Sequence, residues 1–159
     1  MRPMRPAMLR APRGSRGASL LEALIALLIF SVGLLGLLGL QANALGASRD
    51  AQYRAEAAVL AHEIIGVMWT DRANLTEYTH YGTAGTTCAP SGSASTNDNA
   101  LAWLNQFTTA GGLRFLPGAT SAAQQIMVDV DRTVRVTVCW RGPQDAGWHN
   151  YTAVARIPA

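Results

Sequence analysis

The sequence contains no lysine, and no acidic residue precedes Gly17. All 13 basic residues are arginine, and five of them lie before Gly17. Without residues 1–17, eight arginines and ten acids remain, which gives a net charge of −2. The positive charge of the leading segment predicts that the amino terminus stays on the cytoplasmic side of a membrane. Direct nucleic-acid binding is not expected, because the only candidate basic patch, Arg132, Arg135 and Arg141, fits a solvated strand face better.

The sequence also lacks a recognisable catalytic constellation. His62 and Glu63 begin like a zinc-protease motif, but the second histidine of that motif does not follow. His80 and His149 have no spacing typical of metal ligands, and no serine lies in a nucleophile-elbow setting. We therefore expect no enzymatic activity, no metal site and no cofactor.

Charge is absent from residues 23–40, an apolar stretch long enough to span a bilayer as a helix. Glu22 immediately precedes this uncharged stretch and interrupts the longer run that starts at Ala18. A charge inside a membrane-length segment costs at least ~2.5 kcal/mol at mid-bilayer, so this carboxylate needs a partner or a purpose. Neither an ordinary secretory signal nor an ordinary anchor helix has a use for it.

The residues around Glu22 carry a resemblance to a known family. A basic leader ends at Gly17, the sequence Ala-Ser-Leu-Leu-Glu follows, and an uninterrupted apolar run comes next. This pattern resembles the type IV pilin family, in which a dedicated peptidase cuts after the glycine and glutamate is the fifth mature residue. The resemblance implies cleavage between Gly17 and Ala18 and makes Ala18 a candidate for N-methylation, although the family usually has Phe or Met there.

Glu22 is the fifth mature residue under this resemblance. Cleavage would create a free α-amine at Ala18, and this amine and the Glu22 carboxylate could neutralise each other within one chain or between neighbours. We expect the pairing between neighbours to set the axial register of docking, which is a well-attested use of a buried charge.

The helix is expected to continue beyond the membrane. Residues 41–68 contain no proline and keep a helical pattern of apolar side chains. The members of this apolar stripe are Tyr53, Ala57, Leu60, Ile64 and Val67. The second half of the helix is therefore predicted to pack on a globular domain.

The last third of the chain is predicted to be β. Apolar residues alternate with polar ones over residues 126–130, 133–140 and 151–157, which favours an antiparallel meander with one face on the amphipathic helix. Residues 82–87 and 91–96 are predicted to be loops, since they are rich in Gly, Ser and Thr.

A short helix is predicted between the loops and the strands. Asn97 or Asp98 would cap it, and Gly111 and Gly112 would end it. Its apolar residues are Leu101, Leu104 and Phe107, and Trp103 is expected to cover an edge of the core.

Cys88 and Cys139 are the only cysteines. They would lie outside the cytoplasm, where an oxidising compartment permits them to pair, and we favour a disulfide over two free thiols. Closing a loop of about 50 residues suggests roughly 4 kcal/mol of stabilisation by the chain-entropy model.

The resemblance and the pattern together predict an α+β pilin fold. A long amino-terminal helix, membrane-spanning in its first half and amphipathic in its second, would pack on a carboxy-terminal antiparallel sheet. The expected segments are a cleaved leader (1–17), a transmembrane assembly helix (18–40), an amphipathic continuation (41–70) and a periplasmic globular domain (71–159).

The finer resemblance is to minor pilins, within these to the PilV group of type IV pilus modification proteins. It rests on residues 19–22, 33–41, 98–107, 116–118 and 136–140. It implies a structural subunit of a pilus initiation or tip complex, anchored once in the inner membrane. The implied partners are prepilin peptidase, other minor pilins, the major pilin and the pilus assembly platform.

Three alternatives remain open. A minor pseudopilin of a type II secretion system would carry the same signal, and a tip adhesin or a DNA-uptake pilin would share the fold. A secreted enzyme could instead lose a signal peptide after Ala42-Asn43-Ala44. Against the last alternative, the apolar region exceeds the usual ~7–15 residues and contains Glu22.

Overall fold

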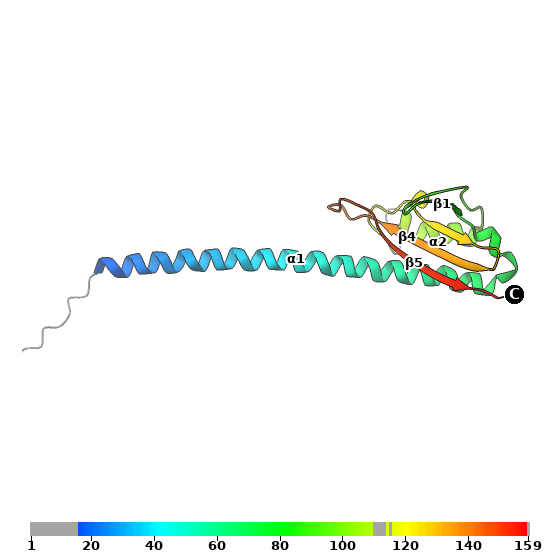
Figure 1. The fold of residues 1–159 in the computed structure, drawn as a ribbon. Helices are drawn as coiled ribbons and strands as arrows, with labels where there is room; N and C mark the ends of the chain where they lie inside the picture. The colour runs from blue at the N-terminus through cyan, green and yellow to red at the C-terminus, as the bar shows by residue number, and fades with distance from the viewer. Residues whose placement is uncertain (1–15, 110–113, 115, 159) are drawn as a thin grey trace, which may run out of the picture. The chain divides into compact units, whose positions relative to one another are not determined.

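The computed structural model describes residues 16–109, 114 and 116–158 (Figure 1). The chain divides into two compact units, Met1–Gly46 and Ala47–Ala159. In chain order the elements are α1 (Arg16–Thr70), the 3-10 helix η1 (Arg72–Tyr78), β1 (Thr83–Thr86), β2 (Ala89–Ser91), α2 (Asp98–Thr108), the 3-10 helix η2 (Ser121–Ala123), β3 (Gln125–Val128), β4 (Thr133–Trp140) and β5 (His149–Arg156). A long amino-terminal helix followed by antiparallel strands confirms the predicted α+β fold.

The described part of the first unit is helix. Every side chain from Ser19 to Gly46 is exposed, although most of them are apolar. Leu20, for example, is 70% exposed, and Phe30 is 64% exposed. Among the described residues this is the one helix long and apolar enough to cross a membrane, with a mean hydropathy of 2.7 over its best window. So large an apolar surface requires lipid or other helices around it.

The second part of α1 belongs to the core of the other unit. Ala57, Leu60 and Ile64 are fully buried, and Tyr53 and Val67 are partly buried against the same cluster. The predicted apolar stripe is therefore confirmed. Three further residues widen it: Ala61, Ile65 and Met68.

The three main strands form an antiparallel sheet in the order β3-β4-β5. Ile126 is paired with Val136, and Val136 is paired with Ala153. All three side chains are buried in one cluster with the core residues of α1. One face of the predicted meander thus packs on the amphipathic helix, because alternate side chains of a strand point to the same face.

Helix α2 begins as predicted from its cap. The Asn97 side chain accepts a hydrogen bond from the backbone N–H of Ala100 at 3.1 Å. Trp103 does not lie at an edge: it is 2% exposed, and its indole Nε1–H donates to the carbonyl oxygen of Leu60 at 2.9 Å. The helix ends at Thr108, and the predicted stop at Gly111 and Gly112 lies outside the described residues.

Residues 83–91 form a small hairpin where a loop was predicted over residues 82–87, whereas residues 92–96 lie outside helices and strands, as predicted. Strands β1 and β2 pair with each other, and the register shifts between Thr83 and Thr86. The prediction of loop over residues 82–87 was wrong because the fully exposed β1 has no alternation of apolar and polar residues. A disulfide between Cys88, in the hairpin turn, and Cys139, on β4, ties the hairpin to the sheet.

An ion-pair cluster joins Arg114 to α1. Arg114 Nε lies 3.3 Å from Glu56 Oε1, and Arg114 Nη1 lies 2.7 Å from Glu63 Oε2. Gln106 Nε2, from α2, donates to Glu63 Oε1 at 3.3 Å. All three charged side chains are about one-third exposed, so solvent screens the pairs and their contribution to stability is small.

Candidate functional site

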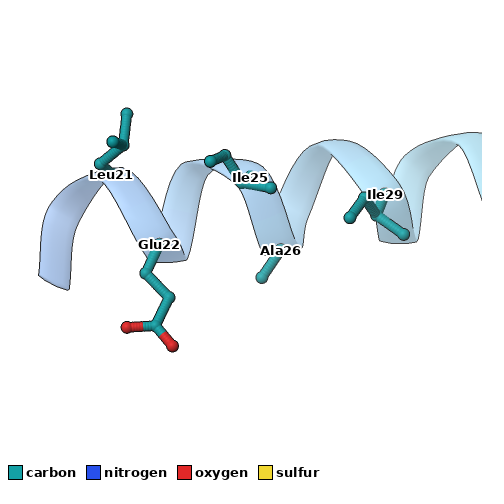
Figure 2. Close-up of a pocket in the computed structure, with 5 residues that line it drawn as sticks. All are labelled: Leu21, Glu22, Ile25, Ala26 and Ile29. Atoms are coloured by element: carbon teal, nitrogen blue, oxygen red, sulfur yellow. The ribbon is translucent and has the colours of Figure 1, made fainter. Parts of the chain in front are cut away.

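Glu22 lies near the start of α1 on an apolar helix surface. It lines a shallow open hollow together with Leu21, Ile25, Ala26 and Ile29. Residues three, four and seven positions apart are neighbours on a helix, so Glu22, Ile25, Ala26 and Ile29 share one face. In the view of Figure 2, the side chains of Glu22 and Ala26 point down from the helix and that of Leu21 points up.

The Glu22 carboxylate has no hydrogen-bond or ion-pair partner among the side chains that the structure describes. Its neighbour one turn on is Ala26, which has no side chain beyond Cβ and leaves space beside the carboxylate. An unpaired carboxylate on an apolar face is costly in lipid, so Glu22 is a candidate for pairing with a cation from outside the described chain.

The backbone at Gly17 and Ala18 lies in the first turn of α1, because the helix begins at Arg16. This start lies two residues before the one expected from the sequence. The Ala18 side chain is outside the described residues, so the predicted cleavage, N-methylation and pairing with Glu22 stay predictions.

The other candidate groups are not gathered into a reactive cluster. Over the described ranges there is no group of three or more His, Cys, Asp or Glu residues able to hold a metal ion. His62 is exposed and lies 2.7 Å from the carbonyl oxygen of Ala58 through Nδ1, and His149 pairs with Asp145 at 3.1 Å.

The basic patch considered from the sequence is only partly available. Arg132 donates to the backbone carbonyls of Ile157, at 2.9 Å, and Arg72, at 2.7 Å. The Arg141 guanidinium lies 5.3 Å from the ring centroid of Trp148. Two of the three arginines are therefore engaged within the fold, which agrees with a structural interpretation of the patch.

His80 is a titratable group that no sequence pattern singled out. Its side chain is fully buried, Nε2 lies 3.0 Å from the Ser121 carbonyl, and the Ser95 N–H donates to Nδ1 at 3.0 Å. These partners require a neutral ring with the proton on Nε2, since a second proton on Nδ1 would meet the Ser95 N–H. Burial lowers the pKa of His80 below its usual value, and the Ser121 carbonyl only partly opposes this.

We expect His80 to make the stability of the second unit depend on pH. Its pKa in the folded state is lowered from 6.5, so the unfolded chain binds more protons just below pH 6.5. The stability that the neutral ring contributes is complete above that pH and falls as the pH drops toward the folded pKa. The slope is at most about 1.4 kcal/mol per pH unit for one proton.

Denaturant unfolding of the full chain in detergent between pH 8 and pH 5 measures this dependence. His80→Gln should remove that part of the slope, whereas the matched variant of the exposed His62, His62→Gln, should keep it. Equal slopes in wild type and His80→Gln would contradict the assignment to His80.

Comparison with known proteins adds one finding at the amino terminus. Residues 12–38 match the family model described as the prokaryotic N-terminal methylation motif. No curated protein and no solved structure matched the chain.

The matched motif covers the end of the basic segment, Glu22 and most of the exposed apolar part of α1. It is typical of type IV pilin-like proteins of a pilus or a pseudopilus, which are structural subunits, and it implies a substrate of prepilin peptidase. The motif and the one apolar helix also fit a single-pass protein of the inner membrane. Over residues 12–38 the chain is therefore similar to type IV pilin-like proteins.

Proposed function

We propose that this protein is a minor pilin, a structural subunit of the complex that initiates or caps a type IV pilus. The observation that carries the proposal is Glu22, an exposed carboxylate without a described partner inside the matched motif. The PilV group of minor pilins is the finer assignment, because of the sequence resemblances over residues 33–41, 98–107, 116–118 and 136–140.

In this proposal the segments have distinct tasks. Residues 1–17 form the leader that prepilin peptidase removes, and residues 18–40 hold the subunit in the inner membrane before assembly. Residues 41–70 connect this helix to the periplasmic domain, residues 71–159. The apolar surface of residues 19–46 supports this division, because it would be covered first by lipid and then by the helices of other pilins.

Glu22 would select the position of each subunit in the growing filament. After cleavage, the α-amine of Ala18 on one subunit is a cation of suitable charge for Glu22 on the next. The gap beside Ala26 supports this pairing, since it leaves room for a backbone amine to approach. Axial displacement of a subunit would leave both charges unpaired in an apolar environment, which is strongly unfavourable.

The test replaces the charge while keeping the shape of the side chain. We expect the Glu22→Gln protein to be inserted and cleaved normally but to be absent from sheared filaments. If pilus initiation depends on this subunit, the number of pili should also fall at least about tenfold. Immunoblotting of membrane and filament fractions, with pilus counts by electron microscopy, measures both effects.

Ser31→Ala is the matched control. The Ser31 hydroxyl lies in the same apolar segment, but it donates to the Leu27 carbonyl at 2.7 Å and is satisfied within its own helix. This variant should assemble like wild type. Normal incorporation of Glu22→Gln would overturn the proposed role of the carboxylate, and normal pili with a defect in protein secretion would assign the chain to a pseudopilus.

A further inference from the structure

A polar pocket lies on the three-stranded sheet, outside the site at Glu22. Its volume is about 240 Å³. Strands β3, β4 and β5 provide one side and the β1–β2 hairpin provides the other. The lining residues that matter for its chemistry are Gln125, Arg135, Thr137, Asn150 and Thr152.

The strand register brings these side chains together on the sheet face away from the core. Gln125 is paired with Thr137, and Thr137 is paired with Thr152, so the three form one row across the sheet. Arg135 lies two residues before Thr137 on β4, and Asn150 lies two residues before Thr152 on β5. Because side chains two positions apart share a face, all five face the same side.

The wall formed by the hairpin is fixed in place. The disulfide joins Cys88 to Cys139 beneath it, and Gln125 Nε2 donates to the carbonyls of Tyr81, at 2.8 Å, and Thr83, at 3.1 Å. The pocket is therefore formed before any ligand arrives, which lowers the cost of ordering on binding.

The polar groups of the pocket keep unused hydrogen-bonding capacity. Both N–H groups of Gln125 are used, so its Oε1 remains an acceptor. The hydroxyls of Thr137 and Thr152 lie 3.1 Å apart, and the pair retains one donor and several lone pairs. Asn150 is exposed, and among the described residues Arg135 has no ion-pair partner.

This set of groups selects the chemistry of a ligand. Arg135 is the one charged residue among those that line the pocket, and a guanidinium favours a carboxylate or phosphate. A fully ionised inorganic anion has no donor for the acceptor oxygen of Gln125 or for the threonine lone pairs. A ligand with one carboxylate and several hydroxyls satisfies all of them. The pocket is smaller than the ~300 Å³ of ordinary ligand pockets, so the ligand is limited to about one small ring.

We propose that this pocket binds a single acidic sugar ring of the uronic-acid class. The carboxylate lies against Arg135, and the ring hydroxyls exchange hydrogen bonds with Gln125, Thr137, Asn150 and Thr152. This binding does not depend on assembly into a filament, so it can be measured on the isolated chain and judged separately from the role of Glu22.

The test titrates the full chain with glucuronate and follows binding by saturation-transfer NMR. The detergent must carry no sugar head group, because a glycoside would compete for the pocket. We expect saturable binding to wild type and affinity lower by about 10- to 100-fold for Arg135→Gln, since a charge-assisted hydrogen-bond pair is lost. Arg156→Gln removes an exposed arginine of β5 that does not line the pocket, and it should bind like wild type.

Three further ligands separate the sources of the signal. Glucose should bind at least about tenfold more weakly than glucuronate because it lacks the carboxylate, and acetate should do so because it lacks the hydroxyls. Methyl glucuronoside carries a methyl group where a polysaccharide would continue, so it should bind like glucuronate if the pocket accepts the terminal ring of a polysaccharide. The proposal would be overturned by any of three results: no saturable binding of glucuronate, equal binding of acetate, or full affinity in Arg135→Gln. Equal binding of acetate would instead indicate a site for an acidic protein side chain.

Discussion

Loss of the Cys88–Cys139 disulfide should lower the free energy of unfolding of the second unit by about 4 kcal/mol. The two cysteines are 51 positions apart, so the bond removes many conformations from the unfolded chain. The disulfide also holds the exposed hairpin β1–β2 against the sheet, together with the hydrogen bond from Gln125 to the Thr83 carbonyl. Such a loss is a large part of the 5–15 kcal/mol by which domains are typically stable.

The variant should be Cys88→Ala/Cys139→Ala, since Cys139 is fully buried and a serine hydroxyl there would need a partner. Urea unfolding in detergent, followed by tryptophan fluorescence, measures the change. Reductant should destabilise wild type by a similar amount and leave the double variant unchanged. A wild-type midpoint that does not respond to reductant would contradict the assigned contribution.

The second large effect is expected at Trp103. Trp103→Ala should lower the free energy of unfolding by about 3–5 kcal/mol, because it opens a cavity in the core between α1 and α2. The indole also makes an edge-on contact with Phe107, at 5.0 Å between ring centroids, and donates to the Leu60 carbonyl. Urea unfolding followed through the remaining tryptophans, which include the buried Trp140, measures the loss.

Two variants divide this effect into its parts. Trp103→Phe keeps most of the volume and removes the indole N–H, so it should cost about 1–2 kcal/mol. Leu101→Ala is the matched control on the same helix, where the side chain is 38% exposed, and it should cost less than about 1 kcal/mol. If Trp103→Ala is no more harmful than Leu101→Ala, α2 is not packed on α1 as the structure has it.

Periodicity explains how much of the fold could be predicted. The stripe from Tyr53 to Val67 and the alternation over residues 133–140 are local patterns, and each predicts which face is buried. Hairpin β1–β2 could not be predicted in the same way, because its strands are short and exposed. The disulfide that ties it to the sheet joins positions far apart in sequence.

The same distinction separates the two candidate sites. Glu22 could be found from the sequence because its signal is local: a glycine, a carboxylate five residues later and an apolar run. The pocket around Arg135 could not, since strand alternation places Arg135 on the outer face but does not reveal the hairpin beside it. The ion pairs of Arg114 with Glu56 and Glu63 were missed for the same reason, being contacts between distant segments.

We expect this chain to be a processed pilin-like subunit. The most direct test is the intact mass of the protein from membranes of cells with and without prepilin peptidase. We expect a chain that starts at Ala18 only when the peptidase is present, with an additional mass of about 14 Da if the new amino terminus is methylated. A chain that starts after Ala44 whether or not the peptidase is present would contradict the account and indicate a secreted domain.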